Sequence, residues 1–249
     1  MGQPGLTKRR GSYGFDAPYV VVFLATGGLC SLIINVVRVA TGTPLLWAGP
    51  FFIGGFATLT IVAGFVYTTR LGKFAVWQDL LQELELRGDE RVLDLGCGRG
   101  AVLTAAATLV PRGRTVGIDL WRTGDQSGNS IDAARRNAEL EGVTDRVELC
   151  TGDLRDLPFG DDSFDLVLSS MAIHNIRGIA GRQRAVDEAM RVLKPGGRLL
   201  VADFRTVTAY RDRLWQRGMV DITTRTLDWR FWYGGPWSAT KLVVATKPS

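Results

Sequence analysis

Two long apolar stretches without a charged residue most constrain how this chain can fold. They run over Ala17–Val37 and Pro44–Tyr67 in a sequence of 249 residues. Crossing the hydrocarbon core of a bilayer takes about 20 predominantly apolar residues in a helix. Each stretch is long enough, and the short connector RVATGT joins them. The sequence therefore predicts a transmembrane helical hairpin over residues 17–71.

Two other interpretations of these stretches stay open. The basic start before the first stretch, Lys8 to Arg10, is also typical of a cleaved signal peptide. The apolar run is longer than that of a usual signal peptide and a second span follows at once, which favours a retained anchor. A buried hairpin of a soluble protein is the third interpretation, although the domain downstream looks complete without it. In an anchor, small residues would let the helices approach closely: Gly27, Gly28, Ser31, Gly54, Gly55 and Ala57.

Basic residues flank the hairpin on one side. Residues 8–10 precede it and Arg70 and Lys73 follow it, whereas Arg38 alone lies in the connector. The positive-inside rule then predicts that both flanks lie in the cytoplasm. We expect a cytoplasmic N-terminal segment (1–16) and an integral protein of the cell membrane. The catalytic domain, over 72–249, would face the cytoplasm.

Charge and cysteine content narrow the class of protein. The net charge of +5 suits nucleic acid or the anionic cytoplasmic face of a membrane. No stretch interleaves arginine with aromatic residues in a recognised RNA-binding pattern, so nucleic acid is not expected as a partner. Cys30, Cys97 and Cys150 lie far apart, with neither metal-binding spacing nor a disulfide framework. Since His174 is the single histidine, no metal site is predicted.

Beyond residue 72 the sequence predicts alternating helices and strands. A helical pattern over 72–88 places Phe74, Trp77 and Leu80 on one face. The expected strands are Arg91–Leu95, Thr115–Leu120, Val147–Thr151, Phe164–Ser169 and Arg198–Asp203. The expected helices are Gly100–Leu109, Ser130–Glu141, Arg182–Leu193 and Val207–Gly218. Two more strands follow around an aromatic loop. Such alternation predicts an α/β fold with a parallel sheet covered on both faces.

The stretch VLDLGCGRGAVL (92–103) joins a strand to a helix through a glycine-rich turn. Asp94 lies near the end of the strand, and Gly96, Gly98 and Gly100 follow it. Glycine lets the backbone turn tightly and lets a ligand approach the chain, while the helix N-terminus adds unpaired N–H groups. The string also fits G-x-G-x-x-A, a dinucleotide fingerprint. An NAD(P)-dependent membrane-anchored reductase is therefore an alternative.

Four later strings accompany this turn. Asp119 in VGIDLW ends the second strand, where a carboxylate can accept from two ribose hydroxyls. Asp153 in TGDLRDLPF follows the third strand and could accept from an adenine amino group. The strings DSFDLVLSSMAIHNI and AMRVLKPGGRLLVADF complete the series. In this order and spacing, the set resembles the class I S-adenosylmethionine-dependent methyltransferases from about Leu80 to the C-terminus.

The resemblance implies a fold and a cofactor. The fold is a Rossmann-like methyltransferase sheet of seven strands, the last antiparallel, with helices on both faces; here two transmembrane helices precede it. The cofactor is S-adenosyl-L-methionine, with Asp94 near its amino group and Asp119 at its ribose. Asp153 and Leu154 would meet the adenine, and Ser169 would line the cofactor at the exit of the fourth strand. The implied contact set is Asp94, Gly96, Cys97, Gly98, Asp119, Leu120, Gly152, Asp153, Leu154 and Ser169, although Cys97 also suits a packing role.

The methyl acceptor in this family usually lies past the fourth strand, where this chain reads SSMAIHNI. That string departs from the N/D-P-P-Y/F pattern of many amino-methylating relatives, which argues against a nitrogen acceptor such as DNA adenine. His174 is the side chain there that can act as a base near neutral pH, and Asn175 lies beside it. The alternative is a histidine that hydrogen-bonds the backbone and only shapes the pocket.

Together these features predict methyl transfer to a small-molecule or lipid-like acceptor, at oxygen or carbon, at the cytoplasmic face of a membrane. An anchor raises the local concentration of membrane-dissolved acceptors, which favours a lipid, a quinone or another apolar molecule. A non-catalytic, cofactor-binding membrane scaffold is a second alternative beside the reductase. The aromatic segment 228–237 suits a membrane interface, an apolar pocket or a packed hairpin loop. Four arginines could touch anionic headgroups or form a solvated face: Arg205, Arg211, Arg213 and Arg217. No oligomeric state is predicted.

Overall fold

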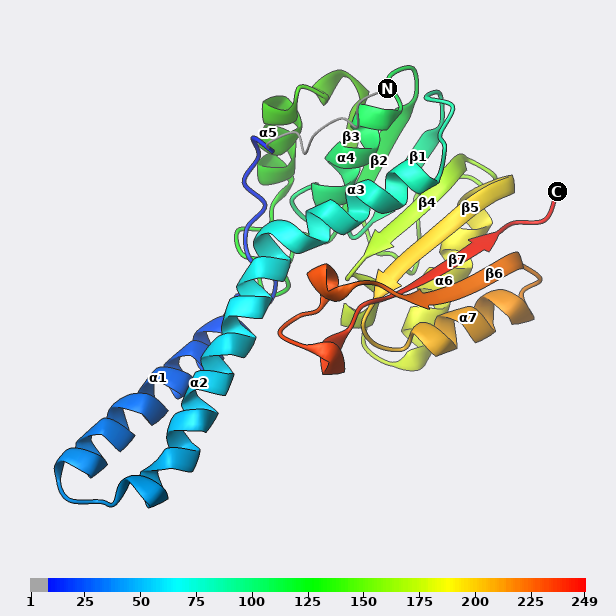
Figure 1. The fold of residues 1–249 in the computed structure, drawn as a ribbon. Coiled ribbons are helices and arrows are strands. Elements are labelled where there is room, and N and C mark those ends of the chain that lie inside the picture. The colour runs from blue at the N-terminus through cyan, green and yellow to red at the C-terminus, as the bar shows by residue number, and fades with distance from the viewer. Residues whose placement is uncertain (1–8) are drawn as a thin grey trace.

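The computed structural model describes residues 9–249, in which a helical hairpin projects from an α/β domain (Figure 1). Of the basic residues expected to flank the hairpin, Lys8 lies outside the described residues. The hairpin consists of α1 (Pro18–Ala40) and α2 (Leu45–Tyr67). The two helices lie side by side along their length and turn at the end far from the domain.

Two of the expected small residues hold the hairpin together. A Cβ atom added at Gly55 would lie 2.6 Å from Cδ2 of Leu32, and one at Gly28 would lie 3.0 Å from Cδ2 of Leu59. By contrast, a Cβ at Gly27 or Gly54 would meet nothing within 4 Å. Close packing therefore depends on the Gly28–Gly55 face, because only a missing side chain lets the neighbouring leucines interlock.

The remaining surface of the hairpin is apolar and exposed. Within residues 9–249, two helices are long and apolar enough to cross a membrane, and only 11% of the apolar window of each is buried. A core helix of a soluble protein would be largely buried. The exposed side chains include Tyr19, Val22, Phe23, Leu29, Ile33, Ile34, Leu45, Leu46, Trp47, Ile53 and Phe56.

The second helix of the hairpin continues into the domain without a break. After α2, one π-helical segment, η1 (Thr68–Gly72), leads into α3 (Lys73–Glu83). The expected division between residues 71 and 72 thus falls inside a continuous helix. A Cβ at Gly72 would lie 1.8 Å from the carbonyl oxygen of Arg230, so a glycine is needed where this helix meets the aromatic loop.

Seven strands of residues 9–249 form one mixed sheet in the order β3-β2-β1-β4-β5-β7-β6. The strands are β1 (Arg91–Leu95), β2 (Arg114–Asp119), β3 (Val147–Thr151), β4 (Phe164–Ser170), β5 (Leu193–Asp203), β6 (Val220–Thr226) and β7 (Lys241–Thr246). The first five run parallel, and β7 pairs antiparallel with both β5 and β6. The predicted seven-stranded sheet and its terminal hairpin are confirmed.

Helices cover both faces of the sheet, as predicted. They are α4 (Ala101–Leu109), α5 (Ile131–Glu141), α6 (Ile179–Val192) and α7 (Val207–Gln216), in addition to α3. Side chains on one face of the strands pack with α6 and α7, and those on the other pack with α3 and α4. The largest differences from expectation are at three boundaries: the helix predicted over 72–88 ends at Glu83, α6 begins at Ile179, and β5 begins at Leu193 because its first residue already pairs with Phe164.

Residues 9–17, which we call the N-terminal strap, pack against the domain. The Tyr13 hydroxyl lies 3.0 Å from Oγ1 of Thr104 in α4 and donates to Glu141 of α5. The Ser12 backbone exchanges hydrogen bonds with the Asn137 amide. The strap precedes the hairpin in sequence, yet in space it packs on the α/β domain and is not a separate segment.

Candidate active site

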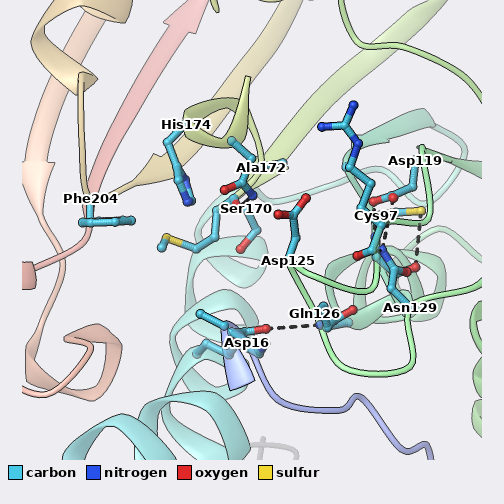
Figure 2. A pocket seen from close by; sticks show the side chains of 18 of the residues that line it. Asp16, Cys97, Asp119, Asp125, Gln126, Asn129, Ser170, Ala172, His174 and Phe204 are labelled. Atoms are coloured by element: carbon cyan, nitrogen blue, oxygen red, sulfur yellow. Dashed lines mark hydrogen bonds and ion pairs between the residues drawn. The ribbon is translucent and has the colours of Figure 1, made fainter. Parts of the chain in front are cut away.

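A cavity of about 970 Å³ opens at the carboxyl ends of the parallel strands (Figure 2). Ligands of open α/β sheets bind at this edge, because the loops that follow the strands converge there. The cavity has two differently built ends. We call one the polar end, lined by Asp94, Gly96, Gly98, Asp119 and Asp153, and the other the apolar end, lined by Val20, Leu24, Ile61, Phe65 and Trp237.

The structure brings the predicted site residues together around this cavity, with one exception. Those that line it are Asp94, Gly96, Cys97, Gly98, Asp119, Leu120, Gly152, Asp153, Leu154, His174 and Asn175. The exception is Ser169, which is fully buried and donates to the Leu95 carbonyl at 3.3 Å. Successive side chains of a strand point to opposite faces, so the next residue, Ser170, lines the cavity instead.

The glycine turn adopts a conformation that larger residues disfavour. Gly96 and Gly98 have φ of 70° and 52°, and a Cβ at Gly96 would lie 2.3 Å from Cβ of Ala172. The turn is fixed from outside by the Asp119 carboxylate, which accepts from the Gly98 N–H at 2.9 Å. The absence of side chains therefore lets Ala172 and the Gln126 side chain pack directly against the turn.

Asp94 lies buried at the polar end, where the Leu103 backbone N–H of α4 faces its carboxylate without a hydrogen bond of good geometry. It is 1% exposed, and among residues 9–249 neither carboxylate oxygen has a hydrogen-bond partner. Burial raises the pKa of this carboxyl group to about 7. An orphaned buried acid facing a cavity is the arrangement expected for a group that pairs with a cationic ligand.

Asp119 organises the loops around the same end. Its carboxylate accepts from the N–H groups of Gly98 and Trp121 and from the Asn129 side-chain amide at 3.2 Å. A carboxylate has about four acceptor positions, so capacity is left for a ligand hydroxyl. Asp119 therefore both holds the glycine turn and presents an acceptor to the cavity.

Asp153 presents an oriented carboxylate on the next loop. Arg155 binds both of its oxygens, at 2.9 and 2.5 Å, and these hydrogen bonds lower the pKa of Asp153. Leu154 is almost buried beside it, and Leu120 is exposed at the cavity rim. This loop combines an acceptor with apolar contact, which suits a flat heterocycle.

Cys97 contributes to packing more than to chemistry. Its sulfur lies where a side chain at Gly117 would otherwise sit, 2.7 Å from an added Cβ. Burial raises the pKa of the Cys97 thiol well above its usual value. A thiol that stays protonated is a poor nucleophile, so the packing role is favoured.

His174 lies beside a buried carboxylate that the sequence analysis did not assign to the site. Nδ1 of His174 is 2.8 Å from Oδ1 of Asp203, within ion-pair distance, although among residues 9–249 this nitrogen lacks a partner in hydrogen-bonding direction. Asp203 is fully buried and also accepts from the backbone N–H groups of His174 and Phe204. The Phe204 ring meets the imidazole edge-on at 4.9 Å (Figure 2). Carboxylate and ring thus fix the imidazole from two sides.

Asn175 shapes the turn that carries His174. Its side-chain amide donates to the carbonyl of Met171 at 3.4 Å, and the residue lies at the exposed rim of the cavity. Met171 itself has a φ of 56°, a backbone conformation that residues other than glycine rarely adopt. Such backbone strain concentrates at functional sites.

The apolar end is built by segments far apart in the sequence. The aromatic loop between β6 and β7 packs against the base of α2: Trp229 stacks on Tyr67 at 5.2 Å, and Tyr233 meets Phe65 edge-on at 4.9 Å. Trp229 is 62% exposed and Trp237 is 71% exposed. The aromatic segment is thus both a packed loop and a wall of the cavity.

The arginines after β5 are mostly engaged by carboxylates. Arg213 and Arg217 both bind Asp187, and Arg211 binds Asp212. Arg205 lies over the Phe204 ring at the cavity rim. A free basic patch for headgroups on α7 is therefore not supported.

Sequence reasoning missed three residues of the site. Asp203 ends a predicted strand, and an acidic residue at the carboxyl end of a parallel strand could have indicated a site residue. Asp16 and Gln126 meet across the cavity floor although 110 positions separate them (Figure 2). Nothing local in either string indicates the contact.

The residues present fit S-adenosylmethionine. Unpartnered Asp94 suits an amino cation, Asp119 has acceptor capacity for a ribose hydroxyl, and the Asp153–Leu154 loop suits adenine. No group of His, Cys, Asp and Glu suited to hold a metal ion occurs in the part of the chain that the structure describes.

Comparisons with known proteins agree with this geometry. The model of the methyltransferase domain family matches residues 86–226. The ubiquinone/menaquinone biosynthesis C-methyltransferase UbiE of Dinoroseobacter shibae is 35% identical over 134 residues, 53% of this chain and 50% of that protein. The demethylmenaquinone methyltransferase of Symbiobacterium thermophilum is 32% identical over 131 residues, 52% of this chain and 49% of that protein. The chain thus spans about half the length of the curated relatives it matches.

Solved structures share the fold at low sequence identity. A SAM-dependent methyltransferase from Aquifex aeolicus superposes with a TM-score of 0.53 at 18% identity, over 68% of this chain and 88% of that one. The family match overturns the reductase alternative that the glycine fingerprint had left open. The chain belongs to the class I S-adenosylmethionine-dependent methyltransferases, whose methyltransferase domain it carries over residues 86–226.

Proposed function

We propose that this chain transfers a methyl group from S-adenosylmethionine to an apolar, membrane-dissolved acceptor, at a carbon of a quinol-like ring. One observation carries the proposal: the cavity continues from Asp94 and Asp119 to Leu24 of α1 and Ile61 of α2. An acceptor that reaches the polar end can therefore keep an apolar tail against the hairpin. The relatives named for quinone biosynthesis support a quinol head.

The side chains around His174 suit deprotonation of such an acceptor. When bound, S-adenosylmethionine supplies an electrophilic methyl group. Nε2 of His174 would take the proton of the acceptor hydroxyl, leaving its electron pair to the ring and making a ring carbon nucleophilic. That carbon would take the methyl group as the methyl–sulfur bond breaks, and loss of the proton it carried would restore the aromatic ring. Asp203 would stabilise the positive imidazolium, and a fully buried carboxylate does so without competition from water. Phe204 and Trp77 would keep the reacting end dry.

The packing of the hairpin supports a membrane location with the domain on one side. The strap before α1 and the segment after α2 both pack on the domain, so both ends of the hairpin lie on its side. Of the flanking cations, Arg10 and Arg70 are exposed, whereas Arg9 packs over Phe74 and Lys73 binds Asp16. The cytoplasmic orientation of the domain is therefore supported by fewer unpaired flanking cations than the sequence indicated. It agrees with the presence of S-adenosylmethionine in the cytoplasm.

The test uses the full chain in lipid nanodiscs with methyl-labelled S-adenosylmethionine. Two acceptors share one demethylated quinol head, and only one of them carries a polyprenyl tail. We expect label on a ring carbon of the tailed quinol with a much lower KM than for the tail-less one. Equal KM values would overturn the membrane-dissolved acceptor, and label on oxygen would overturn carbon methylation.

The scaffold alternative gives a different pattern in the same experiment. A scaffold binds the cofactor, as titration calorimetry would show, but labels neither quinol nor any fraction of a host-cell extract. That result would overturn the proposed activity and leave the cofactor site intact.

A further inference from the structure

A polar cluster at the floor of the cavity joins four separate segments of the chain. Asp16 of the strap accepts from Nζ of Lys73 at 2.6 Å and from the Tyr233 hydroxyl at 2.8 Å, both through Oδ2. Its other oxygen, Oδ1, accepts from Nε2 of Gln126 at 3.2 Å. Lys73 begins α3, Tyr233 belongs to the aromatic loop, and Gln126 lies in the loop after β2.

Gln126 in turn supports the glycine turn at the polar end. Its Oε1 accepts from the Arg99 N–H at 2.8 Å, and a Cβ at Gly98 would lie 2.6 Å from the same oxygen. The side chain therefore closes over the turn, while its other end is held by Asp16. One amide bridges the strap and the turn that faces the ligand.

The backbone reinforces this link over the neighbouring residues. The Ala17 N–H donates to the Asp125 carbonyl at 3.0 Å. The Ser127 N–H donates to the Phe15 carbonyl, and the Phe15 N–H donates to the Ser127 hydroxyl. The loop held in this way also contains Asn129, which donates to Asp119. The loop 122–129 is thus clamped between the strap and the polar end.

We propose that Asp16 is a positioning residue for the cofactor, acting through Gln126, so that the segment leading into the first hairpin helix forms the outer wall of the cofactor site. In this role Asp16 does not contact the methyl acceptor. The inference rests on cofactor binding, the first part of the proposed function, and is independent of what is methylated.

Two substitutions break the link from opposite sides and, combined, restore it. Asp16→Asn keeps an oxygen that accepts from Lys73 and Tyr233. It places the new side-chain NH2 group opposite the NH2 group of Gln126, so two donors face each other and the hydrogen bond is lost. Gln126→Glu keeps the acceptor for Arg99 but sets a carboxylate against Asp16. In the double variant, amide and carboxylate face each other again with reversed polarity, so the hydrogen bond can re-form.

The measurement is the Kd of S-adenosylmethionine by titration calorimetry in detergent, with the melting temperature recorded for each variant. We expect about a tenfold rise in Kd for each single variant, the scale of one hydrogen bond to a charged group. The double variant should return to within about threefold of the parent. Tyr13→Phe, which removes a strap hydroxyl whose partners are Thr104 and Glu141 and not Gln126, should lower the melting temperature and leave Kd unchanged.

Other outcomes would overturn the proposal. Single variants that bind like the parent would show that Asp16 does not position the cofactor. Additive losses in the double variant, or an equal loss in Tyr13→Phe, would assign the effect to general docking of the strap. A parent protein that fails to bind S-adenosylmethionine would instead defeat the proposed function, which is a distinct result.

Discussion

The two ends of the cavity are built in opposite ways. At the polar end, Asp94, Asp119 and Asp153 each follow or end one of three successive strands, and short local strings place them. At the apolar end, Val20, Ile61 and Trp237 come from two helices and a loop that span nearly the whole chain. The difference teaches that the polar end of the cavity is encoded by local turns, whereas the apolar end depends on how distant segments pack.

Replacing His174 tests the proposed proton transfer and has the largest expected effect. His174→Gln should lower kcat by about 10²–10⁴, because it removes the proposed general base. The Kd of S-adenosylmethionine should stay within about twofold, since Asp94 and Asp119 are untouched. Steady-state kinetics and calorimetry on the same preparation check both values. An unchanged kcat would assign His174 to packing alone.

Replacing Asp94 tests the polar end of the cavity by itself. Asp94→Asn should raise the cofactor Kd by about 10²–10³, the scale of leaving a buried charge unpaired. The same change should stabilise the cofactor-free protein at about pH 8, by at most about 4 kcal/mol, because ionising a buried acid whose pKa is raised to about 7 destabilises the fold. Chemical denaturation without cofactor measures this. A destabilised variant would mean that Asp94 has a structural partner.

The pKa of Asp94 predicts how cofactor affinity depends on pH. The carboxylate must be ionised to pair with an amino cation, so affinity should fall as pH drops through about 7. We expect about a tenfold rise in Kd between about pH 8 and about pH 6. Asp94→Asn should flatten the profile, and a parent profile that is already flat would contradict the assignment.

Trimming the apolar end should affect only the acceptor and should spare the cofactor. Leu24→Ala should raise the KM of a tailed quinol about tenfold through lost apolar contact, with the cofactor Kd unchanged. Leu29→Ala is the matched control, because Leu29 lies on the same helix and is 51% exposed. Equal KM changes in both variants would show that the hairpin acts through the membrane and not through the cavity.

Local patterns predicted most of the fold and one end of the site. Strand β1 and helix α5 begin where the sequence indicates, and Ser130 caps α5 by accepting from the Ala133 N–H. The sequence placed Ser169 at the cavity, whereas the structure places its neighbour Ser170 there, since the end of a strand does not reveal which face its last serine takes. Asp203 was visible as the end of a strand, but its contact with His174 depends on how β5 and the turn after β4 meet.

The remaining features have no local signature. The Asp16–Gln126 contact depends on the strap folding back over α4 and α5, and periodicity within either segment carries no information about it. The continuous helix through α2, η1 and α3 was divided in prediction because Arg70 and Lys73 interrupt the apolar run. In the structure Arg70 is exposed with its guanidinium over the Phe15 ring of the strap, and the charge of Lys73 is paired with Asp16 of the strap.

The unbroken helix from Leu45 to Glu83 has a consequence for how this protein can be dissected or recombined. Cutting the chain at residue 72 to obtain a soluble enzyme would remove the strap, one wall of the cavity and the carboxylate that pairs with Lys73. Grafting the domain onto a foreign anchor would do the same. Hairpin and methyltransferase domain are therefore not interchangeable modules, and a variant freed from the hairpin must rebuild part of the cavity wall.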